Sequence, residues 1–198
     1  VSFGYDPLGR LAAVTNENGL AMQYEYDEQG CRISQTDANG NVTRYAYDVM
    51  GRRIRRTLPG GQTERYEYDR SGNMTNKVDF NGRSTAYEYD AMNRLLVKRP
   101  DPFFAASNVV FAYDAAGQRV GMWDQNGETT CRYDACGRLM EKDTPQGALY
   151  YGYDAEGNVT NLLSSHPDGV NLHYTYDALN RLYTVSDARQ GLTMYQYD

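Results

Sequence analysis

The two histidines of the chain, His166 and His173, flank Asp168 and form its closest approach to a metal-binding or acid–base cluster. Imidazole and carboxylate groups could hold a zinc ion or transfer a proton. Their spacing follows no recognised ligand pattern, and a histidine in a polar loop is solvated by default. We predict no metal site, no catalytic residue, no cofactor-binding residue and no cofactor.

The three cysteines, Cys31, Cys131 and Cys136, could provide a nucleophile or a disulfide. An odd number cannot all pair within one chain, and their spacing fits no metal site. A cysteine nucleophile paired with a histidine has no local support in the sequence. We interpret all three as incidental thiols.

The 26 acidic residues raise two further chemistries. The stretch Asp37-Ala38-Asn39-Gly40-Asn41 looks like part of a calcium loop, but it lacks the ligand alternation and the terminal Glu of an EF-hand. No pair of carboxylates is distinguished as glycoside hydrolysis would require. We therefore predict that the chain is not an enzyme, since catalysis would need the histidines and Asp168 to converge in a cleft.

One basic run, Arg52-Arg53-Ile54-Arg55-Arg56, could bind nucleic acid. The whole chain is acidic, with a net charge of −6 and a pI near 5.0. The run also alternates across both faces of a predicted strand. We therefore expect a solvated sheet edge and no nucleic-acid partner.

These side chains belong to a repeat that runs from one end of the chain to the other. A Tyr-Asp pair occurs ten times at steps of 20 to 24 residues. We call each Tyr-Asp pair, together with the two residues before it, a rung. In nine of the ten rungs the first residue is another Phe or Tyr, as in Tyr24/Tyr26, and only Cys131/Tyr133 departs from this. Residues i and i+2 of a strand share a face, so each rung predicts a strand that presents two rings together.

Each of the first nine Tyr-Asp pairs opens a turn. The pattern Asp-x-x-Gly follows, with Asn93 and Asn180 replacing the glycine in two turns. Asp hydrogen-bonds turn backbone, and Gly or Asn tolerates positive φ. A second turn, often Asn-Gly, lies midway between these turns and predicts a hairpin. One unit is therefore strand, turn, strand, turn, for example strands at residues 10–15 and 20–26.

The repeat predicts an all-β fold of 19 short strands, as tandem antiparallel β-hairpin repeats of about 21 residues in one array over residues 1–198. An open sheet of this width must curl, so we expect a continuous curled or spiralling sheet. Both ends cut through the repeat, which suggests an excerpt of a longer chain. No stretch is apolar for long enough to span a membrane, and no signal peptide is expected.

The fifth repeat is the largest irregularity, with two prolines and a Phe103-Phe104 pair in a long connection at residues 99–108. The two rings could contact a partner, but we favour their folding back over the sheet.

The repeat unit resembles that of the RHS, or YD-repeat, proteins. The signature Tyr-x-Tyr-Asp-x-x-Gly-Arg-Leu, followed by a Thr and an Asn-Gly turn, is nearly intact at residues 5–19 and recurs at residues 133–139. The resemblance covers the whole chain. In this family, β-hairpin repeats spiral into a hollow shell around a C-terminal toxin or effector, in bacterial polymorphic toxins and insecticidal toxin complexes. Related shells support adhesion in the extracellular part of teneurins.

The resemblance implies a non-catalytic structural segment of an RHS shell, secreted or at the cell surface. Its implied partners are the neighbouring RHS repeats of the same chain and an enclosed C-terminal toxin polypeptide. Nothing in the sequence matches the aspartate self-cleavage region that commonly ends bacterial shells, so no protease role is implied for any residue. The alternative is an extracellular adhesion module that binds glycans or a cell-surface protein through exposed tyrosines and the Phe103-Phe104 loop.

Overall fold

The computed structural model describes residues 1–104 and 108–198, and β-strands make up nearly all of its regular structure. The prediction of an all-β chain of tandem antiparallel hairpins is confirmed. The chain forms two compact units, which we call unit 1 (residues 1–106) and unit 2 (residues 107–198). One continuous array over residues 1–198 stays a prediction.

The 19 strands of the described residues match the number predicted from the turns. Those of unit 1 are β1 (Ser2–Tyr5), β2 (Leu11–Asn16), β3 (Gly19–Tyr26), β4 (Arg32–Asp37), β5 (Val42–Tyr47), β6 (Arg53–Thr57), β7 (Thr63–Tyr68), β8 (Met74–Val78), β9 (Ser84–Tyr89) and β10 (Leu95–Arg99). Those of unit 2 are β11 (Val109–Tyr113), β12 (Arg119–Asp124), β13 (Gly127–Tyr133), β14 (Leu139–Thr144), β15 (Gly147–Tyr153), β16 (Val159–Ser164), β17 (Asn171–Tyr176), β18 (Leu182–Asp187) and β19 (Gly191–Met194).

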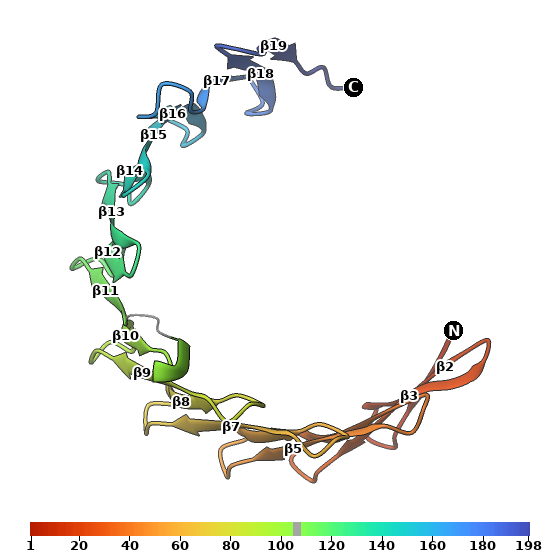
Figure 1. Cartoon of the computed structure of the whole chain (residues 1–198). Coiled ribbons are helices and arrows are strands. Elements are labelled where there is room, and N and C mark those ends of the chain that lie inside the picture. The colour runs from red at the N-terminus through yellow and green to blue at the C-terminus, as the bar shows by residue number, and fades with distance from the viewer. Residues whose placement is uncertain (105–107) are drawn as a thin grey trace. The chain divides into compact units, whose positions relative to one another are not determined.

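Strands that follow one another in sequence also lie side by side. Within each unit every strand pairs antiparallel with the next, from β1 to β10 and from β11 to β19 (Figure 1). Across the described ranges, contacts between elements join only such sequence neighbours. Each repeat is therefore stabilised by the repeats directly before and after it.

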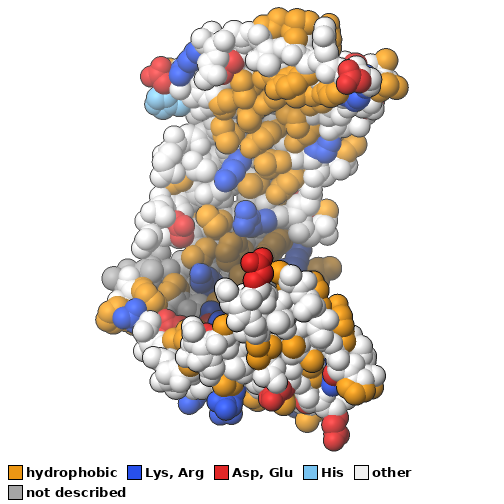
Figure 2. All heavy atoms as spheres, turned by 90° about the vertical axis from the view of Figure 1, so that its right-hand side faces the viewer, with side chains coloured by type: hydrophobic (Ala, Val, Ile, Leu, Met, Phe, Trp, Pro, Cys, Tyr) orange, Lys and Arg blue, Asp and Glu red, His pale blue; other side chains and the backbone are white. Residues whose placement is uncertain are grey.

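The sheet of each unit is a single layer without a conventional hydrophobic core. Cys131 and Ala148 are the buried hydrophobic residues of the described part, and no large side chain there is fully buried. Figure 2 shows hydrophobic side chains gathered on the face of unit 2 that it presents, with Lys and Arg among them. Contacts along the sheet, between one repeat and the next, must therefore supply the stability that a second layer usually gives.

The Asp-x-x-Gly turns have the backbone that the sequence predicted. Their seven glycines all have positive φ, between 74° and 95°. Asn93 and Asn180, which replace glycine in the other two turns, have φ of 62° and 58°. They are the positive-φ residues other than glycine in the described ranges. The position thus requires the left-handed conformation, whichever of the two residue types fills it.

A β-bulge follows every one of these nine turns, a feature that alternation in the sequence does not predict. In each described pairing across such a turn the register skips one residue. Between β3 and β4, Glu25 pairs with Ser34 and Tyr26 pairs with Arg32, so Ile33 is the extra residue. Bulges increase the local twist and change the direction of nearby side chains.

The basic run at residues 52–56 does not lie at a sheet edge, so that prediction is wrong. Strand β6, which contains most of the run, pairs with β5 on one side and with β7 on the other. Alternation of charge along a strand does not show whether the strand is central, because central strands of an uncovered sheet also have solvated faces.

The long connection of the fifth repeat is described only in part, because residues 105–107 lie outside the described ranges. Its first part forms the 3-10 helix η1 (Pro102–Phe104). Arg83, in the β8–β9 turn, lies over both phenylalanine rings, 3.6 Å from the centre of Phe103 and 4.9 Å from that of Phe104. Phe103 is 69% exposed and Phe104 48%, so the pair packs on one turn side chain and does not cover the sheet as predicted. No helix in the described residues has the length and apolarity to cross a membrane.

Candidate functional site

The histidine cluster considered from the sequence is not assembled as a site. In the β16–β17 connection, Nδ1 of exposed His166 accepts a hydrogen bond from the backbone amide of Asp168 at 3.1 Å. His173, on β17, contacts Oδ1 of Asn161 through Nδ1 at 2.5 Å. The Asp168 carboxylate is paired with Arg189 at 3.3 Å. Each group thus has its own local partner, and none converges on a shared position in a cleft.

Metal-ligating side chains do not gather elsewhere in the part of the chain that the structure describes. No group of three His, Cys, Asp or Glu residues there could hold a metal ion. Cys31, Cys131 and Cys136 are free thiols with different exposure: Cys31 is half-buried, Cys131 is buried and Cys136 is exposed. The geometry that recurs along the chain is instead a ladder of polar contacts between repeats.

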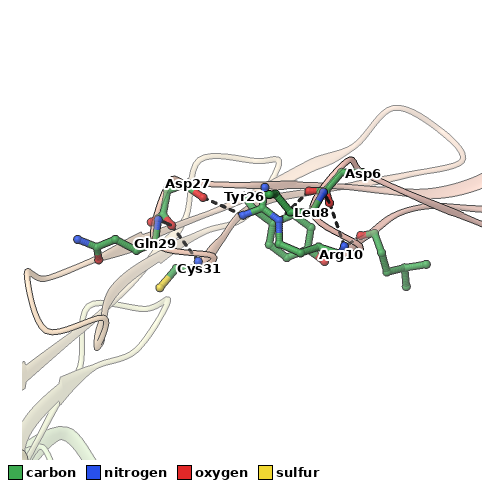
Figure 3. A network of polar contacts seen from close by, with 8 residues as sticks. Asp6, Leu8, Arg10, Tyr26, Asp27, Gln29 and Cys31 are labelled. Atoms are coloured by element: carbon green, nitrogen blue, oxygen red, sulfur yellow. Dashed lines mark hydrogen bonds and ion pairs between the residues drawn. The ribbon is translucent and has the colours of Figure 1, made fainter.

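The first part of this ladder is the aspartate that opens each Asp-x-x-Gly turn. In the first turn, Oδ1 of Asp6 accepts hydrogen bonds from the backbone amides of Leu8 and Arg10, both at 2.9 Å (Figure 3). Its other oxygen, Oδ2, pairs with Nε of Arg10 at 2.6 Å. The hydrogen bond from the Arg10 amide is the main cause that lowers the pKa of Asp6 below its ordinary value. The carboxylate therefore holds the turn closed in its charged form.

The second part is the residue that follows the turn glycine or asparagine, which we call the fifth turn residue. Nη1 of Arg10 donates to the carbonyl of Asp27 in the next turn at 2.9 Å. Nη1 of Arg52 and that of Arg138 make the equivalent bonds to Asp69 and Asp154, at 2.9 and 3.1 Å. Shorter polar residues also reach the next turn, since Gln118 donates to the Gly137 carbonyl at 2.8 Å and Asn73 donates to Asn93 at 2.7 Å. These side chains tie consecutive turns together.

The third part is the second tyrosine of each rung. Its hydroxyl donates to a backbone carbonyl at the start of the preceding strand, so the bond joins two strands that the second turn connects. Eight such bonds, of 2.8 to 3.0 Å, join Tyr26 to Leu11, Tyr47 to Arg32, Tyr68 to Arg53, Tyr89 to Met74, Tyr133 to Arg119, Tyr153 to Leu139, Tyr176 to Val159 and Tyr197 to Leu182. The accepting residue always lies directly after the fifth turn residue.

Removing one of these hydroxyls tests whether the ladder stabilises the fold. We expect Tyr26→Phe to lower the free energy of unfolding by about 1 kcal/mol, because the Leu11 carbonyl loses its side-chain donor. Tyr24→Phe is the matched control, since Tyr24 is the other tyrosine of the same rung and its hydroxyl has no hydrogen bond among the described residues. Urea denaturation followed by circular dichroism measures both. Equal losses for the two variants would contradict a specific role for the Tyr26 hydroxyl.

Arginines also cover the tyrosine rings. Cζ of Arg10 lies 4.7 Å from the centre of the Tyr26 ring, and Arg52 and Arg138 lie 4.9 and 4.6 Å from Tyr68 and Tyr153. First tyrosines of the rungs are covered as well: Arg32 lies over Tyr24 and Tyr45, and Arg53 lies over Tyr45 and Tyr66. Such contacts contribute about 0.5–1 kcal/mol each at exposed sites. Arg52 and Arg53 of the basic run thus contact tyrosine rings of the ladder.

One buried charge interrupts this regular pattern. Glu64 on β7 is only 6% exposed, and its carboxylate pairs with Nζ of Lys77 at 2.7 Å and accepts a hydrogen bond from the hydroxyl of Tyr66. Arg56 stands directly opposite Glu64 in the β6–β7 register. Burial disfavours the charged carboxylate, but the hydrogen bonds from Lys77 and Tyr66 outweigh it and lower the pKa of Glu64.

Tyr66 reports on this cluster through its own ionisation. Burial and the hydrogen bond to Glu64 raise the pKa of Tyr66 to about 12. We expect Glu64→Gln to move that pKa down toward the ordinary value of 10.0, because the phenolate would no longer meet a carboxylate. The pH dependence of the Tyr66 ring signals in NMR measures the shift, with Glu67→Gln on the same strand as control. An unchanged Tyr66 titration in Glu64→Gln would contradict the assigned hydrogen bond.

The fold and the ladder define a tandem β-hairpin repeat protein whose chemistry-bearing side chains mainly hold neighbouring repeats together. The family Teneurin YD-shell matches residues 1–113, and the family RHS Repeat matches residues 113–149 and 153–193. The chain belongs to this family of YD-shell and RHS-repeat proteins. No curated protein matches the chain.

Solved structures with the same fold include toxin complexes. A crystal structure of TcdB2-TccC3 is 18% identical, with a TM-score of 0.67 over 92% of this chain and 14% of its own. A structure of the Photorhabdus luminescens Tc holotoxin pore is 19% identical, with a TM-score of 0.62 over 98% of this chain and 13% of its own. At such identities the likeness concerns the fold. The chain spans only about one seventh of the length of these proteins.

Proposed function

We propose that the chain is a non-catalytic wall segment of an RHS shell that encloses and delivers a C-terminal toxin or effector polypeptide. The observation that carries the proposal is the ladder between repeats. The turn aspartates hold their own turns, most fifth turn residues bond to the next turn, and the second tyrosines bond to the preceding strand, as shown above for Asp6, Arg10 and Tyr26. Side chains held in this way build a wall and leave little that could act on a substrate.

A single-layer sheet suits a wall. With few buried side chains, both faces of each unit contact solvent, and a container needs a face toward its contents and a face toward its surroundings. Nearest-neighbour contacts also allow a wall to be lengthened repeat by repeat. The family membership and the fold shared with the TcdB2-TccC3 and Tc holotoxin structures support a role in an extracellular toxin complex.

A binding role as an adhesion module has one observation in its favour, the exposed pair Phe103 and Phe104. The rung tyrosines favour it less, because stacking on a sugar needs an open ring face and Arg10 and Arg52 already cover two of these rings. A glycan or cell-surface ligand that binds the chain and is lost in a Phe103→Ser, Phe104→Ser double variant would support this second function.

Limited proteolysis of the full-length protein that contains this chain tests the shell role. We expect a C-terminal fragment that stays intact at a protease concentration that digests the same fragment expressed alone, and that becomes digestible after denaturation. Mass spectrometry identifies the fragment. A C-terminal region digested at once in the native protein, or no such region, would overturn the enclosing role.

A further inference from the structure

Three repeats show the same arginine contacts, which serve as a template. Arg10, Arg52 and Arg138 are the fifth residues of their turns, and their Nε atoms pair with the carboxylate of their own turn aspartate at 2.6, 2.7 and 2.7 Å. Their Nη1 atoms donate to the aspartate carbonyl of the next turn. Their guanidinium groups lie over the second tyrosine of the next rung. One guanidinium thus meets a carboxylate, a carbonyl and a ring face.

The second turn has Cys31 where the template has arginine. Oδ1 of Asp27 still accepts the backbone amides of Gln29 and Cys31, at 3.0 and 2.8 Å, but among the described residues its carboxylate has no ion pair (Figure 3). Within the described ranges, the Asp48 carbonyl accepts only the Gly51 amide of its own turn. No described cation lies over the Tyr47 ring within ion–ring contact. The three groups that face an arginine elsewhere are therefore all present without one.

A surface depression is lined by the residues that provide these three groups, Asp27, Tyr47 and Asp48. Its volume is about 410 Å³, and it is lined by Asp27, Glu28, Gln29, Ile33, Tyr47, Asp48 and Val49. Cys31 is not among the lining residues, and its short side chain ends beside the next turn, with Sγ 3.7 Å from where a Cβ on Gly51 would stand. The lining combines the aspartates of two consecutive turns with the ring between them.

We propose that this depression binds the guanidinium group of an arginine side chain from another polypeptide segment. The planar guanidinium can donate to the Asp27 carboxylate and the Asp48 carbonyl at once while stacking on Tyr47, as Arg10 does one repeat earlier. Glu28 adds a second negative charge at the rim. The inference is independent of the shell role, since it concerns which side chain docks on the wall and not what the wall encloses.

A second depression lies at another turn that lacks the arginine, and it fits a guanidinium group less well than the depression near Cys31. About 510 Å³ opens beside Asn158, which also replaces the arginine, and its lining includes Asp154, Tyr176 and Asp177. There Nδ2 of Asn158 donates to the Asp154 carboxylate at 3.0 Å and to Asn180 in the next turn at 3.4 Å. The asparagine thus already occupies the Asp154 carboxylate, one of the three groups that a guanidinium would need.

Titration of the 198-residue chain with a short arginine peptide tests the proposal. The probe is acetyl-Gly-Arg-Gly-amide, followed through the NMR signals of selectively labelled tyrosine rings. We expect a saturable shift of the Tyr47 signals with a Kd on the order of 1 mM. The citrulline peptide, which has the same shape without the charge, and the lysine peptide, which lacks the planar fork, should each bind at least ~10-fold more weakly.

Variants at position 31 provide the controls. Cys31→Ala should bind the arginine peptide like the wild type, whereas Cys31→Arg should lose binding because its own guanidinium fills the depression. Cys31→Arg should also raise the Tm by about 2–4 °C, as expected for roughly one added interaction in a chain of this size. The proposal is overturned if the wild type shows no saturable Tyr47 shift, if the citrulline or lysine peptide binds equally well, or if Cys31→Arg binds like the wild type. The peptide comparison on the wild type decides the matter even if Cys31→Arg does not fold.

Discussion

Replacing Gly72 with valine is expected to lower the free energy of unfolding by about 2 kcal/mol or more. Gly72 closes the fourth Asp-x-x-Gly turn with φ of +92°, a region that β-branched residues enter at high cost. A Cβ added there would meet no atom within 4 Å, so contact of the new Cβ does not cause the loss. The expected cause is backbone strain at positive φ.

Asparagine at the same position is the matched control, because the chain itself uses Asn93 and Asn180 in equivalent turns. We expect Gly72→Asn to cost less than ~1 kcal/mol. Urea denaturation of both variants gives the comparison. Equal destabilisation by valine and asparagine would mean that the left-handed backbone is not what the position requires, and a stable Gly72→Val would mean that the turn has another conformation in solution.

The turns show which part of the fold can be read from sequence. Local backbone requirements determine them: Asp accepts the amide bonds of its own turn, and Gly or Asn takes positive φ, so residue type and conformation are linked within five residues. The strand positions are predicted together with the turns, because the few residues between two turns suffice for only one short strand. The structure confirms both the turn positions and the number of strands.

The side-chain hydrogen bonds that connect strands and consecutive turns are harder to predict from the sequence. The fifth turn residue recurs as arginine in Arg10, Arg52 and Arg138, and this recurrence could have pointed to a contact. Its partner, however, is a carbonyl of the next turn about 17 residues later, and a backbone carbonyl leaves no mark on residue type. The hydroxyl bonds of the second tyrosines escape sequence reasoning for the same reason.

The charged residues of unit 1 show a different limit. Buried Glu64 and half-buried Arg56 face each other across β6 and β7, and half-exposed Lys77 completes the cluster from β8. Alternating polarity cannot distinguish this cluster from a solvated face, because in a single-layer sheet both faces include charged residues. Which charges are buried depends on how far the neighbouring side chains extend over them, here Tyr66 with Arg53 and Lys77 over its ring.

Acid is expected to unfold the chain more readily than its modest net charge would suggest. The pKa values of ten aspartates are lowered by hydrogen bonds made in the folded state: Asp6, Asp37, Asp48, Asp69, Asp79, Asp90, Asp101, Asp134, Asp154 and Asp177. A carboxyl with a lowered folded pKa stabilises the fold fully above its unfolded pKa, near 3.8. As the pH falls through and below that value, the unfolded chain binds more protons, and the stability is lost.

The free energy of unfolding should therefore be nearly constant from about pH 7 to pH 5 and fall steeply below about pH 4. Urea denaturation at a series of pH values measures it, and the slope gives the number of protons taken up on unfolding. Because seven of these ten aspartates open equivalent Asp-x-x-Gly or Asp-x-x-Asn turns after a rung, they should contribute in parallel, so we expect an uptake of several protons.

The variant Asp48→Asn isolates one turn from the rest. The amide oxygen can still accept the backbone bonds from Met50 and Arg52, but the ion pair to Arg52 at 2.7 Å is lost. The variant should be less stable than the wild type at pH 7, and the difference should shrink as the pH falls below 3.8 and the Asp48 carboxyl takes up a proton. Glu28→Gln, at an exposed turn position, should parallel the wild type throughout. A constant difference between Asp48→Asn and the wild type at every pH would show that the charge of Asp48 does not stabilise the turn, because only a charge effect disappears on protonation.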